Sequence, residues 1–144
     1  PEKGKVPSRA TAIHAAIYRK HPWVQSIVNA FPVYTTAFGV TDASFDSRSI
    51  PESFIFLRDL PRLPLESRVD DGSAIANALG ASRPAALLEN DGCIVLGTNV
   101  LNAFDRLEVL ESSAEAMANA RPLGGLVPMG DAEIDELITA FKLP

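Results

Sequence analysis

The chain has 144 residues, of which 47% are hydrophobic and 22% are charged, as in a folded globular domain and not as in a disordered segment. Its net charge is −5 and its thirteen Lys and Arg residues are scattered, so it offers no basic surface to a nucleic acid. No run of about 18 uncharged apolar residues occurs, which argues against a membrane span. We therefore expect one domain, residues 1–144, with neither a nucleic-acid partner nor a membrane-spanning helix.

The single cysteine, Cys93, lies in an apolar run and cannot form a disulfide within the chain, which suits the reducing cytosol. We expect a small buried side chain here and not a nucleophile, in a cytoplasmic protein. The chain begins at Pro1 instead of Met and carries no signal peptide. We interpret it as a domain whose N-terminal segment is absent.

The first part of the chain predicts a helix, a strand and a second helix. Ser8 precedes apolar residues at helical spacing and can cap a helix that runs to about Lys20. His14 falls near the inner face of that helix, where a hydrogen-bonded boundary residue is the expectation. The β-rich run 23–29 predicts a buried strand, and a short helix follows over 33–40.

The middle of the chain is rich in polar residues and prolines. Residues 41–49 predict a loop of the length that often carries function. The apolar pieces 54–57 and 62–65 lie among prolines, which suits the edges of a sheet better than its centre. Ser73 is expected to cap a helix through Leu79.

The last part predicts a hairpin and two helices. The turn Asn90-Asp91-Gly92 lies between two apolar runs, which is a strong hairpin signal, and Thr98 and Asp131 can each cap a helix after it. The inner face of the first of these helices is expected to be Leu101, Phe104, Leu107, Leu110, Ala114 and Met117. Helices interleaved with short strands indicate a mixed or antiparallel sheet covered by helices.

Three stretches resemble the class II aldolase/adducin family in sequence and in order. They are residues 4–18 with the strand to Val28, the hairpin 87–95, and the helix 102–111. The resemblance implies an α/β domain of three layers, α/β/α, with a central, mostly antiparallel sheet covered by helices. The enzymes of that family, such as fuculose- and rhamnulose-phosphate aldolases, epimerases and dehydratases, use a divalent metal, usually zinc.

The resemblance also indicates where the metal ligands would lie. In the family these are two histidines at the end of the strand, a histidine in the hairpin and, in some members, a glutamate that opens the helix and serves as base. Those positions are Asn29, Phe31, Asp91 and Ala10 in this sequence. Phe31 and Ala10 offer no lone pair, and Asn29 is a poor zinc ligand. We therefore expect no metal and no catalytic residue at these degenerate positions, although the family would imply zinc.

The polar positions near this site keep two interpretations each. Asp91 suits the tight turn by itself, and as a carboxylate beside Asn29 it could also bind a cation or a polyol hydroxyl. By resemblance Ser8 falls on a serine that contacts phosphate, and Arg9 falls on the next serine. These two are a candidate anion site at the start of the helix, and a helix cap formed by Ser8 is the simpler alternative.

Two functions are consistent with this pattern. One is a pseudoenzyme, a non-catalytic assembly or ligand-binding module as adducin-type domains are, with a small polyol or sugar as ligand. The other is a sugar-phosphate lyase of the aldolase, epimerase or dehydratase type, active in carbohydrate metabolism through a non-standard site. The degenerate positions favour the first. The resemblance further implies a homo-oligomer, a cyclic tetramer, whose contacts would cover the apolar segment 54–65.

Overall fold

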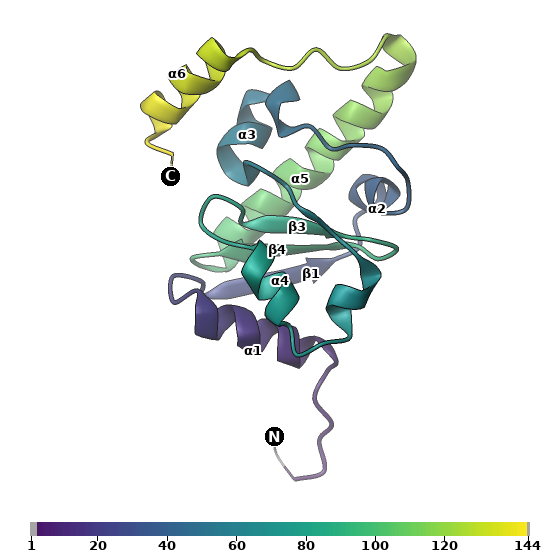
Figure 1. Ribbon diagram of the computed structural model, residues 1–144, viewed down its shortest axis with the longest axis vertical. Coiled ribbons are helices and arrows are strands. Elements are labelled where there is room, and N and C mark those ends of the chain that lie inside the picture. Colours follow the sequence, from purple (N-terminus) through teal and green to yellow (C-terminus); the bar gives the residue numbers. More distant parts are fainter. Residues whose placement is uncertain (1–2, 144) are drawn as a thin grey trace.

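The computed structural model describes residues 3–143 and consists of a four-stranded sheet with helices on both faces (Figure 1). The strands are β1 (Ser26–Ala30), β2 (Arg62–Leu63), β3 (Ala85–Leu88) and β4 (Cys93–Gly97). The helices are α1 (Ala10–Lys20), α2 (Val33–Gly39), α3 (Pro51–Leu57), α4 (Ser73–Ala78), α5 (Val100–Ala120) and α6 (Asp131–Phe141). The short 3-10 turns are η1 (Ser47–Ser49), η2 (Leu65–Arg68) and η3 (Arg121–Leu123). Figure 1 shows α6 at the opposite end of the molecule from α1.

The sheet has the strand order β1-β4-β3-β2, and the hairpin predicted from the sequence forms its centre. β4 pairs antiparallel with both β1 and β3, and β2 adds to the edge of β3 in parallel. Asn90 takes the positive φ of 53° that the tight turn requires, a conformation that Asn tolerates better than most residues. The expected mostly antiparallel sheet is confirmed, and the proline-flanked strand β2 lies at its edge as predicted.

Residues of β4 alternate between two apolar cores because successive side chains of a strand point to opposite faces. Ile94 and Leu96 pack with α1 and α4 on one face. Cys93 and Val95 pack with Leu110 of α5 on the other. Helices therefore cover both faces, which confirms the three-layer α/β/α architecture.

The segment 54–57 is a helix and not a sheet edge, so this expectation from its prolines is wrong. Pro51 occupies the first turn of α3, where its missing amide hydrogen costs nothing. Phe54 and Leu57, one turn apart, are buried on the α5 side of the molecule. The segment is consequently not the exposed apolar edge that a subunit partner was expected to cover.

Three expected helix caps are also displaced by one residue. Asn99, not Thr98, caps α5 through a 2.8 Å bond from the backbone N of Asn102 to its Oδ1. Gly72, not Ser73, precedes α4. Asp131 is the first residue of α6 and forms an ion pair with Arg48 instead of a cap.

The first turns of α5 face solvent with side chains that were expected to point inward. Leu101 is 74% exposed and Phe104 is 48% exposed, whereas Leu110, Ala114 and Met117 are buried as predicted. The cause is a close approach between the helix and β4: a Cβ built on Gly97 would lie 2.5 Å from the backbone N of Ala103. Only the small Ala103 fits there, so the larger side chains turn outward.

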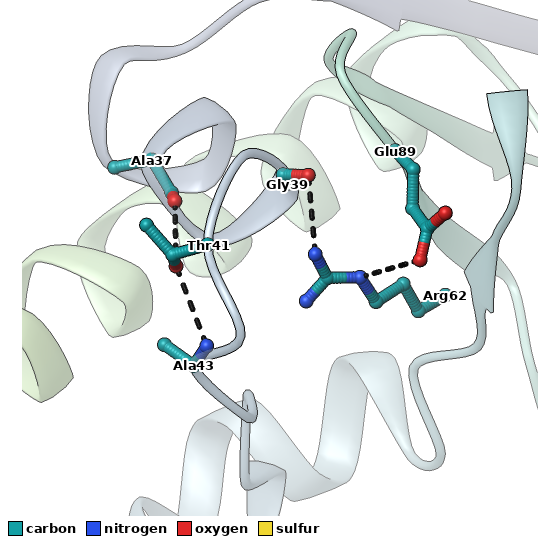
Figure 2. Close-up of polar contacts among 6 residues, drawn as sticks. All are labelled: Ala37, Gly39, Thr41, Ala43, Arg62 and Glu89. Carbon is teal, nitrogen blue, oxygen red and sulfur yellow. Dashed lines mark hydrogen bonds and ion pairs between the residues drawn. The ribbon is translucent and has the colours of Figure 1, made fainter.

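The turn that carries Asp91 is held by the C-terminal end of α2 (Figure 2). The guanidinium of Arg62 donates to Glu89 Oε1 at 3.0 Å and to the carbonyl O of Gly39 at 3.2 Å. The same carbonyl accepts from the backbone N of Asn90 at 3.2 Å. Because orphan carbonyls at a helix end need donors, these bonds stabilise α2 and fix the position of the hairpin turn together.

Within residues 3–143, no helix is both long enough and apolar enough to cross a membrane.

Candidate functional site

A cavity of about 540 Å³ opens between the first turn of α1, the end of β1 and the segment that joins β2 to α4. Its wall is made of Arg9, Ala10, Ile13, Asn29, Leu65, Arg68, Val69 and Asp70. The fold thus places three of the positions derived from the sequence, Arg9, Ala10 and Asn29, in one cavity. The polar loop 41–49 adds nothing to this wall, contrary to what its composition suggested.

A glycine allows the far wall of the cavity to lie against α1. Gly72 has a φ of +85°, and a Cβ built on it would lie 2.5 Å from Ile13 Cα. Two carboxylates shape the backbone around it: Asp70 Oδ1 accepts from the N of Gly72 at 2.6 Å, and Asp71 Oδ1 from the N of Ser73 at 3.0 Å. Hydrogen bonds from Ser73 hold the pKa of Asp71 below its ordinary value, and the bond from the Ser73 hydroxyl has a larger effect than the bond from its backbone N.

Asn29, on the α1 side of β1, is hydrogen-bonded to the helix. His14 Nε2 lies 2.7 Å from Asn29 Oδ1, and because an amide oxygen only accepts, the ring nitrogen donates. His14 is therefore the hydrogen-bonded boundary residue that the helical pattern predicted. The oxygen of Asn29, its better metal-binding atom, is already engaged.

Asp91 is paired with an arginine that the sequence did not single out. Arg68 Nη1 lies 2.8 Å from Asp91 Oδ2, and the two side chains are 36% and 11% exposed. Burial of a carboxylate is costly unless it is paired, and the guanidinium of Arg68 is the partner that offsets this cost for Asp91. Asp91 also occupies its tight turn as expected, whereas its binding of a cation or a polyol hydroxyl stays a prediction.

Three of the positions derived from the sequence, Asp91, Phe31 and Ser8, do not line the cavity. Phe31 is 65% exposed and follows β1 beside Gly92, whose Cβ, if present, would lie 2.9 Å from Phe31 Cδ1. Ser8 is exposed, and its Oγ accepts from the N of Ala10 at 3.3 Å. Ser8 thus bonds to the first residue of α1, but the N-cap residue is Arg9, so the expected cap is displaced by one residue. Of the expected anion pair only Arg9 lines the cavity.

The residues present do not fit a divalent metal of the kind the resemblance implied. Among residues 3–143, no cluster of three or more His, Cys, Asp or Glu side chains could hold a metal ion. Zinc sites need about three or four His, Cys or carboxylate ligands. Here Asn29 Oδ1 and Asp91 Oδ2 are engaged by His14 and Arg68. A cation introduced at this point would also meet the fixed positive charge of Arg68.

Comparisons with known proteins show to which family this chain belongs. The model of the class II aldolase and adducin N-terminal domain matches residues 1–118. The chain belongs to the class II aldolase and adducin family. A 3-oxo-tetronate 4-phosphate decarboxylase of Haemophilus influenzae is 30% identical over 118 residues, which are 78% of this chain and 56% of that protein. An L-fuculose phosphate aldolase of Methanococcus vannielii is 31% identical over 119 residues, 78% of this chain and 61% of that protein.

Solved structures of family members share the fold. An L-fuculose 1-phosphate aldolase superposes with a TM-score of 0.81 and 23% identity, over 99% of this chain and 68% of that one. A protein of Klebsiella pneumoniae, whose name offers aldolase, epimerase or decarboxylase activity, gives a TM-score of 0.76 and 27% identity, over 93% of this chain and 67% of that one. The chain spans a little over half the length of the curated relatives it matches. Membership in the aldolase and adducin family therefore establishes the fold and superfamily of this chain.

Arg68 is the residue of this site that sequence reasoning missed. It lies in η2, 23 positions before its partner Asp91, in a stretch that resembled no family motif. The one available signal was Asp91 itself, because a carboxylate in a folded hairpin beside an apolar strand calls for a cationic partner. With thirteen Lys and Arg in the chain, that signal could not identify which one.

Proposed function

We propose that this chain is a non-catalytic, ligand-binding member of the class II aldolase and adducin family that works without a metal. The donor set of the cavity supports this. Of the four positions where the resemblance implies metal ligands or the base, Ala10 and Phe31 hold no donor atom, and Asn29 and Asp91 each have a protein partner. The site retains the shape of a binding cavity and polar groups in its wall, which suit a small polar ligand such as a polyol or sugar derivative.

Carbon–carbon lyase chemistry requires a proton acceptor and a group that stabilises the developing oxyanion. Position 10 is alanine, so the first role has no occupant at the place where the family has its base. The alternative function, a sugar-phosphate lyase with a non-standard site, is compatible with the names of the relatives. It would need a base from elsewhere in the cavity, where Asp70 is the carboxylate in the wall.

Metal content is the first test. Elemental analysis of protein purified without chelator should find no stoichiometric zinc, because the site lacks the imidazoles that retain it. About one zinc per chain that is lost in Asn29→Ala or Asp91→Ala would overturn the proposal. A variant with restored ligands tests whether these four positions correspond to those of the family's metal site. Zinc binding should return when four substitutions are combined: Ala10→Glu, Asn29→His, Phe31→His and Asp91→His. If it does not, the positions have been carried over wrongly.

Turnover is the second test and separates the two functions. The protein should not measurably cleave L-fuculose 1-phosphate or L-rhamnulose 1-phosphate, nor decarboxylate a 3-oxo-tetronate 4-phosphate, in the presence or absence of added zinc. Turnover at about 1 s⁻¹ or faster, an ordinary enzymatic rate, would favour the lyase. Asp70→Asn would then show whether the carboxylate of the cavity wall is its base.

We also propose that the protein forms a homo-oligomer, a tetramer by resemblance. The support lies at the start of α5, where Val100, Leu101 and Phe104 are exposed on neighbouring turns. Exposed apolar side chains in a group are typical of surfaces that another subunit covers. Light scattering at micromolar concentration should give a multiple of the monomer mass, and Leu101→Glu with Phe104→Glu should reduce it. A monomer mass for the unaltered protein would contradict this part of the proposal.

A further inference from the structure

We propose that Arg68 takes the place of the metal as a fixed cation, and that with Arg9 it binds the carboxylate of a small hydroxy acid. This inference rests on the proposed ligand-binding function and names the class of ligand. Its starting point is the Arg68–Asp91 ion pair, which joins the hairpin position that the resemblance assigns to the metal site to an arginine in the cavity wall.

The guanidinium of Arg68 is held in place by Asp91, and this contact engages only part of its hydrogen-bond donors. It has five N–H donors in a rigid plane, and its pairing with Asp91 is through Nη1. Asp91 is the more buried of the two, and its turn is held by α2, so the carboxylate acts as a fixed anchor. Arg68 is 36% exposed and lines the cavity, so its remaining donors are available to a ligand. A planar fork of donors matches the two oxygens of a carboxylate.

The charges of the cavity favour a ligand with one negative charge over one with two. Arg68 and Asp91 neutralise each other as a pair. Arg9 adds one positive charge to the wall and Asp70 adds one negative charge. A monocarboxylate placed between the two arginines would meet Arg9 as its counterion. A phosphate ester would bring close to two negative charges into a cavity whose wall also holds the carboxylate of Asp70, and like charges repel.

The remaining polar groups of the wall suit hydroxyls next to the carboxylate. Asn29 turns its oxygen to His14, and its amide nitrogen has no hydrogen-bond partner among residues 3–143. The exposed carboxylate of Asp70 accepts from the N of Gly72 and has further lone pairs that can accept from hydroxyl groups. An acceptor and a donor beside the two arginines therefore match a hydroxy acid better than a simple fatty acid.

The test measures binding of three small probes by calorimetry: D-glycerate, glycerol as its neutral analogue, and glycerol 3-phosphate as the dianion. Glycerate should bind saturably, about tenfold or more tighter than either of the others, since a charge-assisted pair of hydrogen bonds is worth at least that factor. Equal or tighter binding of glycerol or of glycerol 3-phosphate, or no saturable binding of glycerate at tens of millimolar, would overturn the inference.

Variants then locate the binding. Arg68→Lys keeps a positive charge for Asp91 but loses the planar fork, so it should fold and bind glycerate about tenfold more weakly. Arg68→Gln, checked by circular dichroism, should weaken binding further. Arg83→Gln, at an exposed arginine that does not line the cavity, is the matched control and should leave binding unchanged. Full glycerate affinity in Arg68→Lys and Arg68→Gln would refute the role of Arg68.

These outcomes can be told apart from failure of the proposed function. Stoichiometric bound zinc or turnover of a sugar phosphate would contradict the proposed function, whether or not the protein binds glycerate. A protein that holds no metal, has no turnover and does not bind glycerate would contradict only the inference about Arg68.

Discussion

Glu111 in the middle of α5 is the capping group of α2, although 76 residues separate it from Thr35. Its Oε1 accepts from the backbone N of Tyr34 at 2.9 Å, and its Oε2 accepts from the N and the Oγ1 of Thr35, each at 2.8 Å. The two backbone N–H groups belong to the first turn of α2 and have no partner within the helix. Pro32, which precedes that turn, has no hydrogen-bond acceptor on its side chain that could bond to them. α2 in turn holds the hairpin turn of Asp91.

Glu111→Gln tests this arrangement with almost no change in volume. The amide keeps one acceptor oxygen and replaces the other with an NH₂ group, which then faces donors of Thr35 or Tyr34. Hydrogen bonds to a charged acceptor contribute about 1.5–3 kcal/mol each, and a buried donor left unsatisfied costs about 1–3 kcal/mol. We expect a loss of about 2–4 kcal/mol, a large part of the ~5–15 kcal/mol typical of a domain.

Urea unfolding followed by circular dichroism measures this loss. With an m-value of about 2 kcal/mol/M, the midpoint should fall by about 1–2 M. Glu115→Gln, one turn later and exposed on the same helix, is the matched control and should shift the midpoint little. Thr35→Val should destabilise the protein less in the Glu111→Gln background than alone, because the two residues share a bond. Equal midpoints for Glu111→Gln and Glu115→Gln would refute this account of α2.

Two further predictions concern the sheet. Burial raises the pKa of the Cys93 thiol from 9.0 to about 12, so the folded chain keeps a proton that the unfolded chain loses. The resulting stability is complete below pH 9 and is lost towards pH 12, by at most about 1.4 kcal/mol per pH unit. Urea midpoints between pH 8 and about 10.5 should fall less steeply in Cys93→Ala, and parallel slopes would contradict this. Gly92→Ala places a Cβ 2.0 Å from the carbonyl O of Ala30, so it should lower the free energy of unfolding by about 3 kcal/mol or more. Gly80→Ala, whose Cβ meets no atom within 4 Å, is the control and should change it little. Similar urea midpoints for the two variants would contradict this account.

Local chemistry accounts for the elements that were predicted correctly. The hairpin 85–97 combines a turn sequence with two apolar runs, and both signals act over a few residues. The same holds for α2, which follows Pro32, and for α1 with its helical apolar spacing. In the segment 54–57 local signals conflicted, because prolines suit both a sheet edge and the first turn of a helix. Packing against α5 decided for the helix.

Close approach between elements explains the remaining errors. Leu101 and Phe104 fit a helical apolar stripe, but Gly97 brings β4 so near to the first turns of α5 that the small Ala103 faces inward there. This approach depends on how closely α5 packs on the preceding strand β4, and periodicity within the helix carries no information about that distance.

The sequence by itself indicated the family, which the match over residues 1–118 confirms, and by resemblance it predicted Ala10, Asn29, Phe31 and Asp91 as the degenerate metal-site positions. Only the tertiary structure decided what stands in the cavity instead. Arg68 reaches Asp91 because Gly72 lets its segment lie against α1. The pairing of two charges is set by their separation in space, which a linear pattern does not encode when many cations are available.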